Sequence, residues 1–132
     1  TKMKNSITYT NAQGLIPPRG HYSHCVTANG FIFISGQLPV DSHGTVHTNV
    51  PFAQQAEQVL SNLEACLTAC GVGKQHLVQV RVYIADMNDW QVFNQIYATW
   101  IGEYRPARAV AGVSELHFGA GLEIEATAVA TN

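Results

Sequence analysis

The segment from Pro51 to Cys70 repeats apolar side chains at the spacing of an α-helix. They stand at positions 52, 56, 59, 60, 63, 66, 67 and 70, which line a single stripe. Pro51 suits the first turn, because an N–H group there has no partner within the helix. Gly71 suits the position after the last turn, where a positive φ is needed. A helix with one apolar stripe must cover another apolar surface, so the rest of the chain must supply one.

Two segments predict strands that can supply that surface. Leu77 to Ala85 and Leu122 to Ala130 alternate apolar and polar side chains, as strands with one buried face do. The predicted apolar face holds Val78, Val80, Val82 and Ile84 in the first strand, with Leu122, Ile124, Ala126 and Ala128 in the second. The opposite face holds Gln79, Arg81 and Tyr83, with Glu123, Glu125 and Thr127.

A hairpin is predicted near the N-terminus. Asn29-Gly30 separates two apolar runs, His24–Ala28 and Phe31–Ser35, and both turn residues tolerate the positive φ of a type I′ turn. Ile7–Thr10 can add a short earlier strand. Residues 38–49 are rich in turn-forming residues and predict a loop.

A second helix is predicted after Asn88, which can cap it together with Gln91 in the capping-box position. Its apolar face holds Phe93, Ile96, Tyr97, Trp100 and Ile101. Pro106 prevents the helix from continuing. A short strand, Ala109–Val113, is expected after it.

These elements predict the order β, β, β, α, β, α, β, β in an α+β fold. We expect one domain over residues 1–132, a mixed sheet with two helices packed on one face. The opposite face still carries apolar side chains such as Tyr83 and Val129. Contact with another copy of the chain would bury them.

The low charge of the chain restricts the classes of partner that we expect it to bind. Lys plus Arg is 7 and Asp plus Glu is 9, so the net charge is −2, and only 12% of residues are charged, against roughly 25% in a typical soluble domain. We expect no nucleic-acid partner, because no basic excess or Lys/Arg run is present. We expect no membrane partner, because no apolar stretch approaches the ~20 residues of a span. Thr1–Ser6 leads into no apolar signal region, so a cytoplasmic location is expected.

The cysteine pattern agrees with a reducing compartment. Cys25, Cys66 and Cys70 are odd in number and form no C-x-x-C motif. Cys66 and Cys70 lie on the apolar stripe of the first helix, where a thiol packs as a small hydrophobe, and a redox pair is the alternative. His21, His24 and Cys25 form an H-x-x-H-C pattern, but no fourth ligand has matching spacing, so no metal site is predicted.

Charged side chains are the best candidates for chemistry, because the chain has no phosphate loop and no nucleophile elbow. Arg105 and Arg108 stand together at the start of a strand, where a guanidinium can hold a substrate carboxylate or form a surface ion pair. Glu123 and Glu125 share one face of a strand, so they are either simply solvated or include a functional carboxylate. Tyr22, taken alone, is a loop aromatic with a structural role.

Four segments stand in a characteristic order along the chain. They are Ile34–Pro39, Asp86–Trp90 followed by Asn94 and Tyr97, Arg105–Arg108, and Gly119–Glu125. Together they resemble the RidA (YjgF) family of reactive-intermediate deaminases. The resemblance extends from about Pro17 to Ala130 and includes the spacing between Arg108 and Glu123.

The resemblance implies a chorismate-mutase-like α+β fold and a homotrimer with three clefts between neighbouring subunits. It also implies hydrolysis of 2-imino acids, and of their enamine tautomers, to 2-oxo acids and ammonia. Such chemistry needs no metal and no cofactor. By position, Arg108 would bind the substrate carboxylate, and Glu123 would position and activate the water.

Further residues follow from the same resemblance. Tyr22, Ser35, Gly36 and Asn94 would line the cleft, and the backbone at Val110 would help to hold the imine nitrogen or the water. Two departures accompany the match. Gly20-His21-Tyr22 stands where the family usually has Gly-Pro-Tyr, and Val110 stands where a cysteine is common.

Three functional hypotheses remain at this stage. The first is an imine/enamine deaminase acting on a small imino acid. The second is a non-catalytic protein that binds 2-oxo acids or similar carboxylates in the same cleft. Glu123 favours the first, because carboxylate binding gains nothing from a second negative charge nearby. The third is a ribonuclease or translation inhibitor, which the net charge of −2 and the absence of a basic, aromatic-lined groove disfavour.

Overall fold

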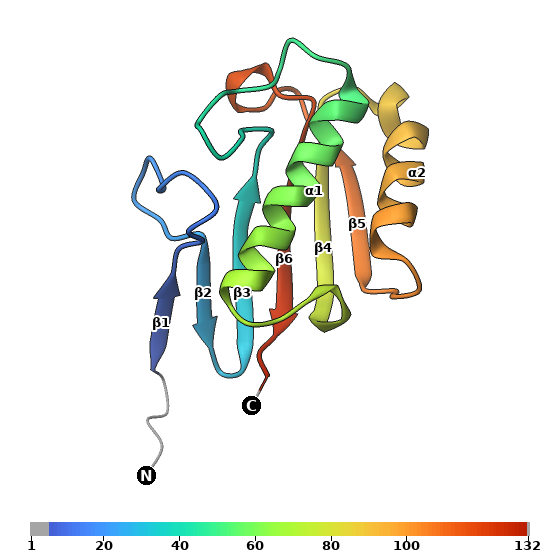
Figure 1. Ribbon diagram of the computed structural model, residues 1–132. Coiled ribbons are helices and arrows are strands. Elements are labelled where there is room, and N and C mark those ends of the chain that lie inside the picture. The colour runs from blue at the N-terminus through green and yellow to red at the C-terminus, as the bar shows by residue number, and fades with distance from the viewer. Residues whose placement is uncertain (1–5, 132) are drawn as a thin grey trace.

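The computed structural model describes residues 6–131 and contains one mixed sheet with two helices (Figure 1). The strands are β1 (Ile7–Thr10), β2 (Cys25–Ala28), β3 (Phe31–Gln37), β4 (Leu77–Ile84), β5 (Ala107–Gly112) and β6 (Leu122–Val129). The helices are α1 (Phe52–Ala69) and α2 (Trp90–Ile101). The predicted α+β class and element order are confirmed. Expectations for Thr1–Asn5 and for the single domain's outermost residues lie outside the described residues.

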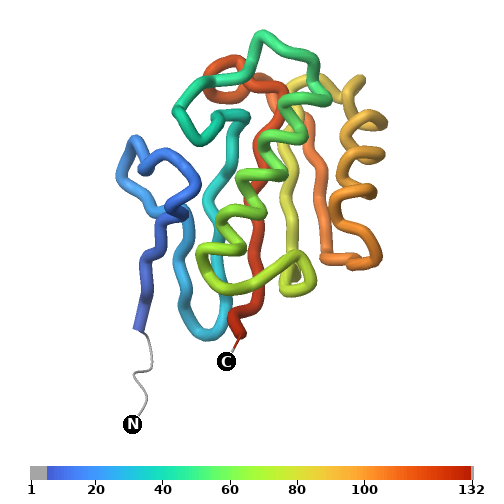
Figure 2. The backbone as a smooth tube through the Cα atoms, in the orientation of Figure 1, coloured from blue at the N-terminus to red at the C-terminus, as the bar shows by residue number. Residues whose placement is uncertain are grey.

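The sheet has the strand order β1-β2-β3-β6-β4-β5. All neighbouring strands are antiparallel except β4 and β5, which are parallel because α2 crosses over between them. The C-terminal strand β6 therefore lies at the centre, and β5 lies at an edge. Figure 2 shows α1 crossing the sheet and α2 running alongside β5.

The helices cover one face of the sheet, as predicted. The α1 side chains Val59, Leu63 and Leu67 are fully buried against Val80 and Ile124 of the sheet. Burial of a large aliphatic side chain stabilises a fold by about 1.5–3 kcal/mol, so this layer contributes strongly to stability. Among the described residues, neither helix is long and apolar enough to cross a membrane.

The ends of the helices agree in part with those that the sequence predicts. Gly71 has φ +73° and follows the last turn of α1, as expected. Pro51 lies just before the helix rather than within its first turn. The prediction that Asn88 caps the second helix is wrong. Met87–Asp89 form a separate 3₁₀ turn, and the side chain of Asp86 accepts a hydrogen bond from the Asn88 backbone N–H.

Two strand predictions need correction. Val78 was expected on the buried face, but a register shift between Leu77 and Gln79 turns it outward, and it is 38% exposed. β5 begins at Ala107, two residues earlier than expected, because it pairs with β4 from Gln79 onward. The Asn29-Gly30 turn has φ values of 53° and 80°, which confirms the predicted hairpin.

The other face of the sheet, which we call the open face, is covered by no helix or strand among residues 6–131. Its β1–β3 half presents Tyr9, Phe31 and Phe33, whose exposed fractions are 69%, 43% and 48%. Its centre carries Glu123, Glu125 and neighbouring polar side chains, and its β5 edge carries only alanines. Exposed aromatic patches of this kind mark contact surfaces.

Candidate functional site

A pocket of about 480 Å³ opens beside the ends of β3 and β6. Four of the residues expected in the cleft line it, namely Tyr22, Ser35, Gly36 and Glu123. Its size is within the usual range for small-molecule sites. The structure thus gathers side chains that are distant in sequence around the Glu123 carboxylate.

The Glu123 carboxylate lies directly against Gly36. A Cβ added to Gly36 would overlap the Glu123 carboxylate. The pairing of β3 with β6 is irregular between Ile34 and Gln37, so this glycine lies in a bulge. Bulges of this kind redirect side chains next to functional sites. The Ser35-Gly36 pair therefore makes room for the carboxylate.

The environment of Glu123 makes its carboxylate a stronger base. Burial raises the pKa of Glu123, and the negative charge of Glu125 raises it further, while His117 lowers it. The Glu125 carboxylate accepts a 2.5 Å hydrogen bond from the Tyr83 hydroxyl. The two carboxylates of this strand therefore differ in role. Glu125 is engaged by a neighbouring strand, and Glu123 faces the pocket.

The segment that carries Tyr22 is tied to the sheet by His24 and Ser35. The His24 imidazole accepts a 3.0 Å hydrogen bond at Nδ1 from the Ala12 N–H, and Ser35 Oγ donates a 2.6 Å bond to the Ser23 carbonyl. Burial lowers the pKa of His24, which favours the neutral ring that accepts this bond. The expected cleft residue Ser35 thus also anchors the loop that brings Tyr22 to the pocket.

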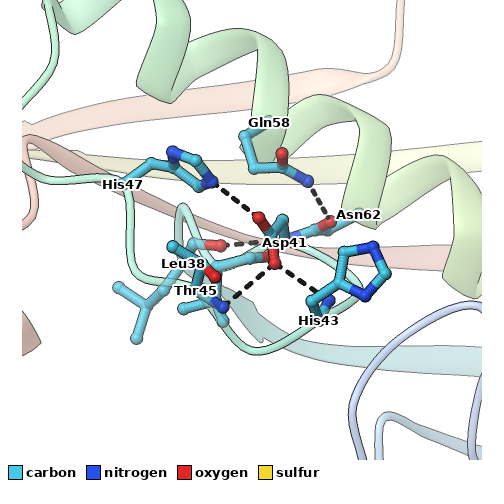
Figure 3. Close-up of polar contacts among 8 residues, drawn as sticks. Leu38, Asp41, His43, Thr45, His47, Gln58 and Asn62 are labelled. Atoms are coloured by element: carbon cyan, nitrogen blue, oxygen red, sulfur yellow. Dashed lines mark hydrogen bonds and ion pairs between the residues drawn. The ribbon is translucent and has the colours of Figure 1, made fainter.

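A polar network holds the opposite wall (Figure 3). The Asp41 carboxylate accepts hydrogen bonds from the backbone N–H groups of His43 and Thr45 and contacts His47 Nε2 at 2.7 Å. These contacts lower the pKa of Asp41 to about 2. The buried Asn62 amide of α1 donates to the carbonyls of Leu38 and Val40. These hydrogen bonds therefore hold the segment 38–47 in place against α1.

Arg108 lies away from this pocket, beside α2. Its Nη1 donates a 3.1 Å hydrogen bond to Asn94 Oδ1. Its guanidinium carbon lies 5.2 Å from the centre of the Trp90 ring and 5.0 Å from that of Tyr97. Cation–π contacts of this kind orient a guanidinium while leaving its other N–H groups free. Arg108 is exposed, so its remaining donors can reach a ligand.

Arg108 and Glu123 occupy opposite faces of the sheet within one chain. Arg108 is paired with the buried Val80 and points to the helix side, whereas Glu123 is paired with Tyr83 and points to the open face. One chain therefore does not bring the two residues, which were expected to share a substrate, into one site. Asn94 lies with Arg108, and Val110 follows two residues later on the same edge strand.

The structure also places Arg105, the cysteines and the possible metal-ligating side chains that the sequence raised. Arg105 donates to the carbonyls of Gly102 and Tyr104 and closes the end of α2. Cys25, Cys66 and Cys70 are all free thiols; the first two are buried in the core, and Cys70 packs partly buried against it. Within residues 6–131, the structure contains no cluster of three or more His, Cys, Asp or Glu side chains that could hold a metal ion.

The sequence did not single out several pocket residues. Arg19, Asp41, Asn62, His117 and Phe118 all line the pocket. His117 and Phe118 belong to a 3₁₀ turn without periodicity, so no pattern marks them. Arg19 did leave a signal, because it is a lone charge in the Pro17–Gly20 loop just before Tyr22.

The fold and pocket define a class of small α+β proteins with a carboxylate-bearing pocket at one end of a half-covered sheet. The family model described as Endoribonuclease L-PSP matches residues 13–130, so the chain belongs to this family, which is the RidA (YjgF) family it was expected to resemble.

Relatives and solved structures agree with this assignment. A RutC family protein of Pyrococcus horikoshii is 39% identical over 96% of this chain and 98% of its own length. The mouse protein named 2-iminobutanoate/2-iminopropanoate deaminase is 36% identical over 96% of this chain and 92% of its own. The crystal structure of RidA from an Antarctic Psychrobacter superposes with a TM-score of 0.87 at 30% identity, covering 92% of this chain and 98% of that one.

Proposed function

We propose that this chain hydrolyses reactive 2-imino acids and their enamine tautomers to 2-oxo acids and ammonia. The observation that carries the proposal is the half-buried Glu123 carboxylate, which borders the pocket and has a raised pKa. A base of higher pKa takes a proton from water more readily near neutral pH. The mouse relative named as an imine deaminase supports the same reaction class.

The proposed reaction uses Glu123 as a proton carrier. The water oxygen adds to the imine carbon while Glu123 takes a water proton and passes it to the nitrogen, which receives the C=N electron pair. The hydroxyl proton of the adduct then travels through Glu123 to the nitrogen as the C–N bond breaks. Ammonia leaves, the carbonyl forms, and the carboxylate is restored. General acid–base catalysis of this kind contributes about 10²–10⁴-fold.

We further propose that the active assembly is a homotrimer and that its sites lie between copies. The opposite orientations of Arg108 and Glu123 support this, because a substrate held by one and hydrolysed by the other needs both. The exposed Phe33 and Tyr9 on the open face support burial by a second copy. Arg108 would hold the substrate carboxylate, Asn94 would orient Arg108, and the Val110 backbone would help to hold the nitrogen or the water.

The test generates imino acids in place with an amino-acid oxidase and traps them with semicarbazide. Wild type should lower the semicarbazone yield, and Glu123→Gln should lose about 10²–10⁴-fold in rate while still binding 2-oxo acids. Glu125→Gln is the matched control. It should remain active and move the acidic limb of the pH–rate profile to lower pH, because the charge that raises the pKa of Glu123 is removed.

Two other outcomes would favour other functions. An unchanged semicarbazone yield with small, branched and aromatic imino acids would leave the carboxylate-binding protein as the better account. The family description names an endoribonuclease, but a chain of net charge −2 lacks the cationic surface that captures nucleic-acid phosphates. A salt titration of RNA binding should therefore detect no salt-dependent complex.

A further inference from the structure

The pocket beside Glu123 also contains an arginine, Arg19, whose donors form no hydrogen bond with residues 6–131. Arg81, Arg105 and Arg108 each donate a hydrogen bond to a side chain or a carbonyl of this chain. Arg19 makes no such bond with the described residues and lines the pocket. A guanidinium offers a rigid fork of donors matched to a carboxylate. Arg19 is therefore a cationic group that faces the pocket without an internal partner among residues 6–131.

The position of Arg19 is set by its loop. Pro17 and Pro18 restrict the backbone that leads to it. Its guanidinium rests against Gly44, where an added Cβ would meet Arg19 Nη2 at 2.7 Å. Gly44 has φ +86°, a conformation that glycine adopts without strain. The fold therefore leaves a specific place for the Arg19 head group on the wall that Asp41 and Asn62 hold in place.

Among residues 6–131, the acidic groups of the pocket form no ion pair with Arg19. Within the described part of the chain, Asp41 forms its ion pair with His47, and the same carboxylate accepts hydrogen bonds from two backbone N–H groups. Glu123 lies against Gly36. Asp41 is therefore occupied by other partners, and Glu123 is held against Gly36. The donors of Arg19 remain available for an acidic group supplied by a ligand.

We propose that Arg19 binds an acidic group at the far end of the substrate, so that this chain prefers 2-imino acids with a terminal carboxylate. The inference rests on the proposed function, because it takes Glu123 as the point where the imine carbon lies. The substrate would then be held at both ends. Arg108 of a neighbouring copy would bind the carboxylate next to the imine, and Arg19 would bind the distal one.

The test compares two kinds of imino acid in the semicarbazide assay. Imines of glutamate and aspartate carry a second carboxylate, and imines of 2-aminobutanoate and methionine do not. Wild type should show the higher kcat/KM with the diacids. Arg19→Gln should lower kcat/KM for the diacids by about 10–100-fold, mainly through KM, since a hydrogen bond to a charged group contributes about 1.5–3 kcal/mol. The monoacids should change by less than about twofold.

Arg105→Gln is the matched control, because this exposed arginine bonds only to nearby carbonyls and does not line the pocket. It should leave the ratio of diacid to monoacid rates unchanged. Arg19→Lys should fall between wild type and Arg19→Gln, since it keeps the charge and loses the fork. Equal losses with both kinds of substrate, or no loss with the diacids, would overturn the role of Arg19.

A binding measurement separates this inference from the proposed function. Calorimetry should find 2-oxoglutarate bound about tenfold more tightly than 2-oxobutanoate by wild type, and equally by Arg19→Gln. If no imine is hydrolysed and this preference persists, the deaminase proposal fails and the Arg19 site stands. If imines are hydrolysed and the two oxo acids bind equally to wild type, the Arg19 site fails and the deaminase proposal stands.

Discussion

The two faces of the sheet place their charged residues in different environments. On the helix side, Arg108 lies at an exposed edge, where the Trp90 and Tyr97 rings and the Asn94 amide fix its direction. On the open face, Glu123 is half-buried, and its surroundings change its pKa. An arginine stays charged in either environment, so it needs only orientation, whereas a carboxylate acquires its chemistry from burial. In the proposed function, substrate binding and proton transfer therefore belong to separate surfaces of one chain.

After that of Glu123→Gln, the largest effect is expected at the helix-side end of the proposed site. Arg108→Ala should lower kcat/KM for imino acids by about 10²–10³-fold, because the proposed site would lose its two charge-assisted hydrogen bonds to the substrate carboxylate. Arg108→Lys should recover little of this loss, since an ammonium cannot form the same fork. Steady-state kinetics check both variants. Wild-type rates for Arg108→Ala would return this residue to the role of a surface arginine.

The open-face end can be disturbed without removing a charge. Gly36→Ala should lower kcat by about 10–100-fold, because the new methyl group displaces the Glu123 carboxylate, and misplacement by about 1 Å costs roughly 10²-fold. Gly14→Ala is the control, since no atom lies within 4 Å of a Cβ added there. Kinetics and thermal unfolding should be measured together. Equal activity of the two variants would contradict the close packing of Gly36 on Glu123.

Apolar residues on the open face should stabilise the assembly of copies, whereas those on the helix side should stabilise the fold of the single chain. Phe33→Glu should leave the monomer folded and dissociate the assembly, because Phe33 is 48% exposed on the open face. Leu63→Ala should lower the free energy of unfolding by about 2–5 kcal/mol, since Leu63 is a fully buried side chain on the sheet-facing side of α1. Light scattering and chemical denaturation distinguish the two effects. A Phe33→Glu protein of wild-type mass would mean that another surface holds the copies together.

The smallest expected effect is on the pH dependence of stability, through His24 in the segment that carries Tyr22. Burial lowers the pKa of His24 from 6.5, so the unfolded chain binds its proton more readily than the folded one. The contribution of His24 is therefore complete above pH 6.5 and decreases as the pH falls through the folded value. His24→Gln should flatten this part of the stability–pH curve. Parallel curves for wild type and variant would contradict the role of the neutral ring.

The sequence predicts the helix-side layer well and the site less well. The stripe that includes Leu63 and the alternation that includes Ile124 each report one buried surface, and burial is what such patterns record. The positions of Val78 and Asn88 were missed, because a register shift and a 3₁₀ turn depend on contacts between segments. Spacing alone also hides that Arg108 and Glu123 face opposite sides, since this follows from the parallel pairing of β5 with β4.

The proposed site combines Arg108 of one copy with Glu123 of another, and mixing two inactive variants tests this arrangement most directly. Arg108→Ala retains Glu123, and Glu123→Gln retains Arg108. When the two are unfolded together and reassembled, mixed assemblies should contain intact sites and recover a substantial part of wild-type imine hydrolysis. Mass spectrometry of the intact assemblies verifies that both variants are present. Mixed assemblies that remain as inactive as the separate variants would contradict a site shared between copies.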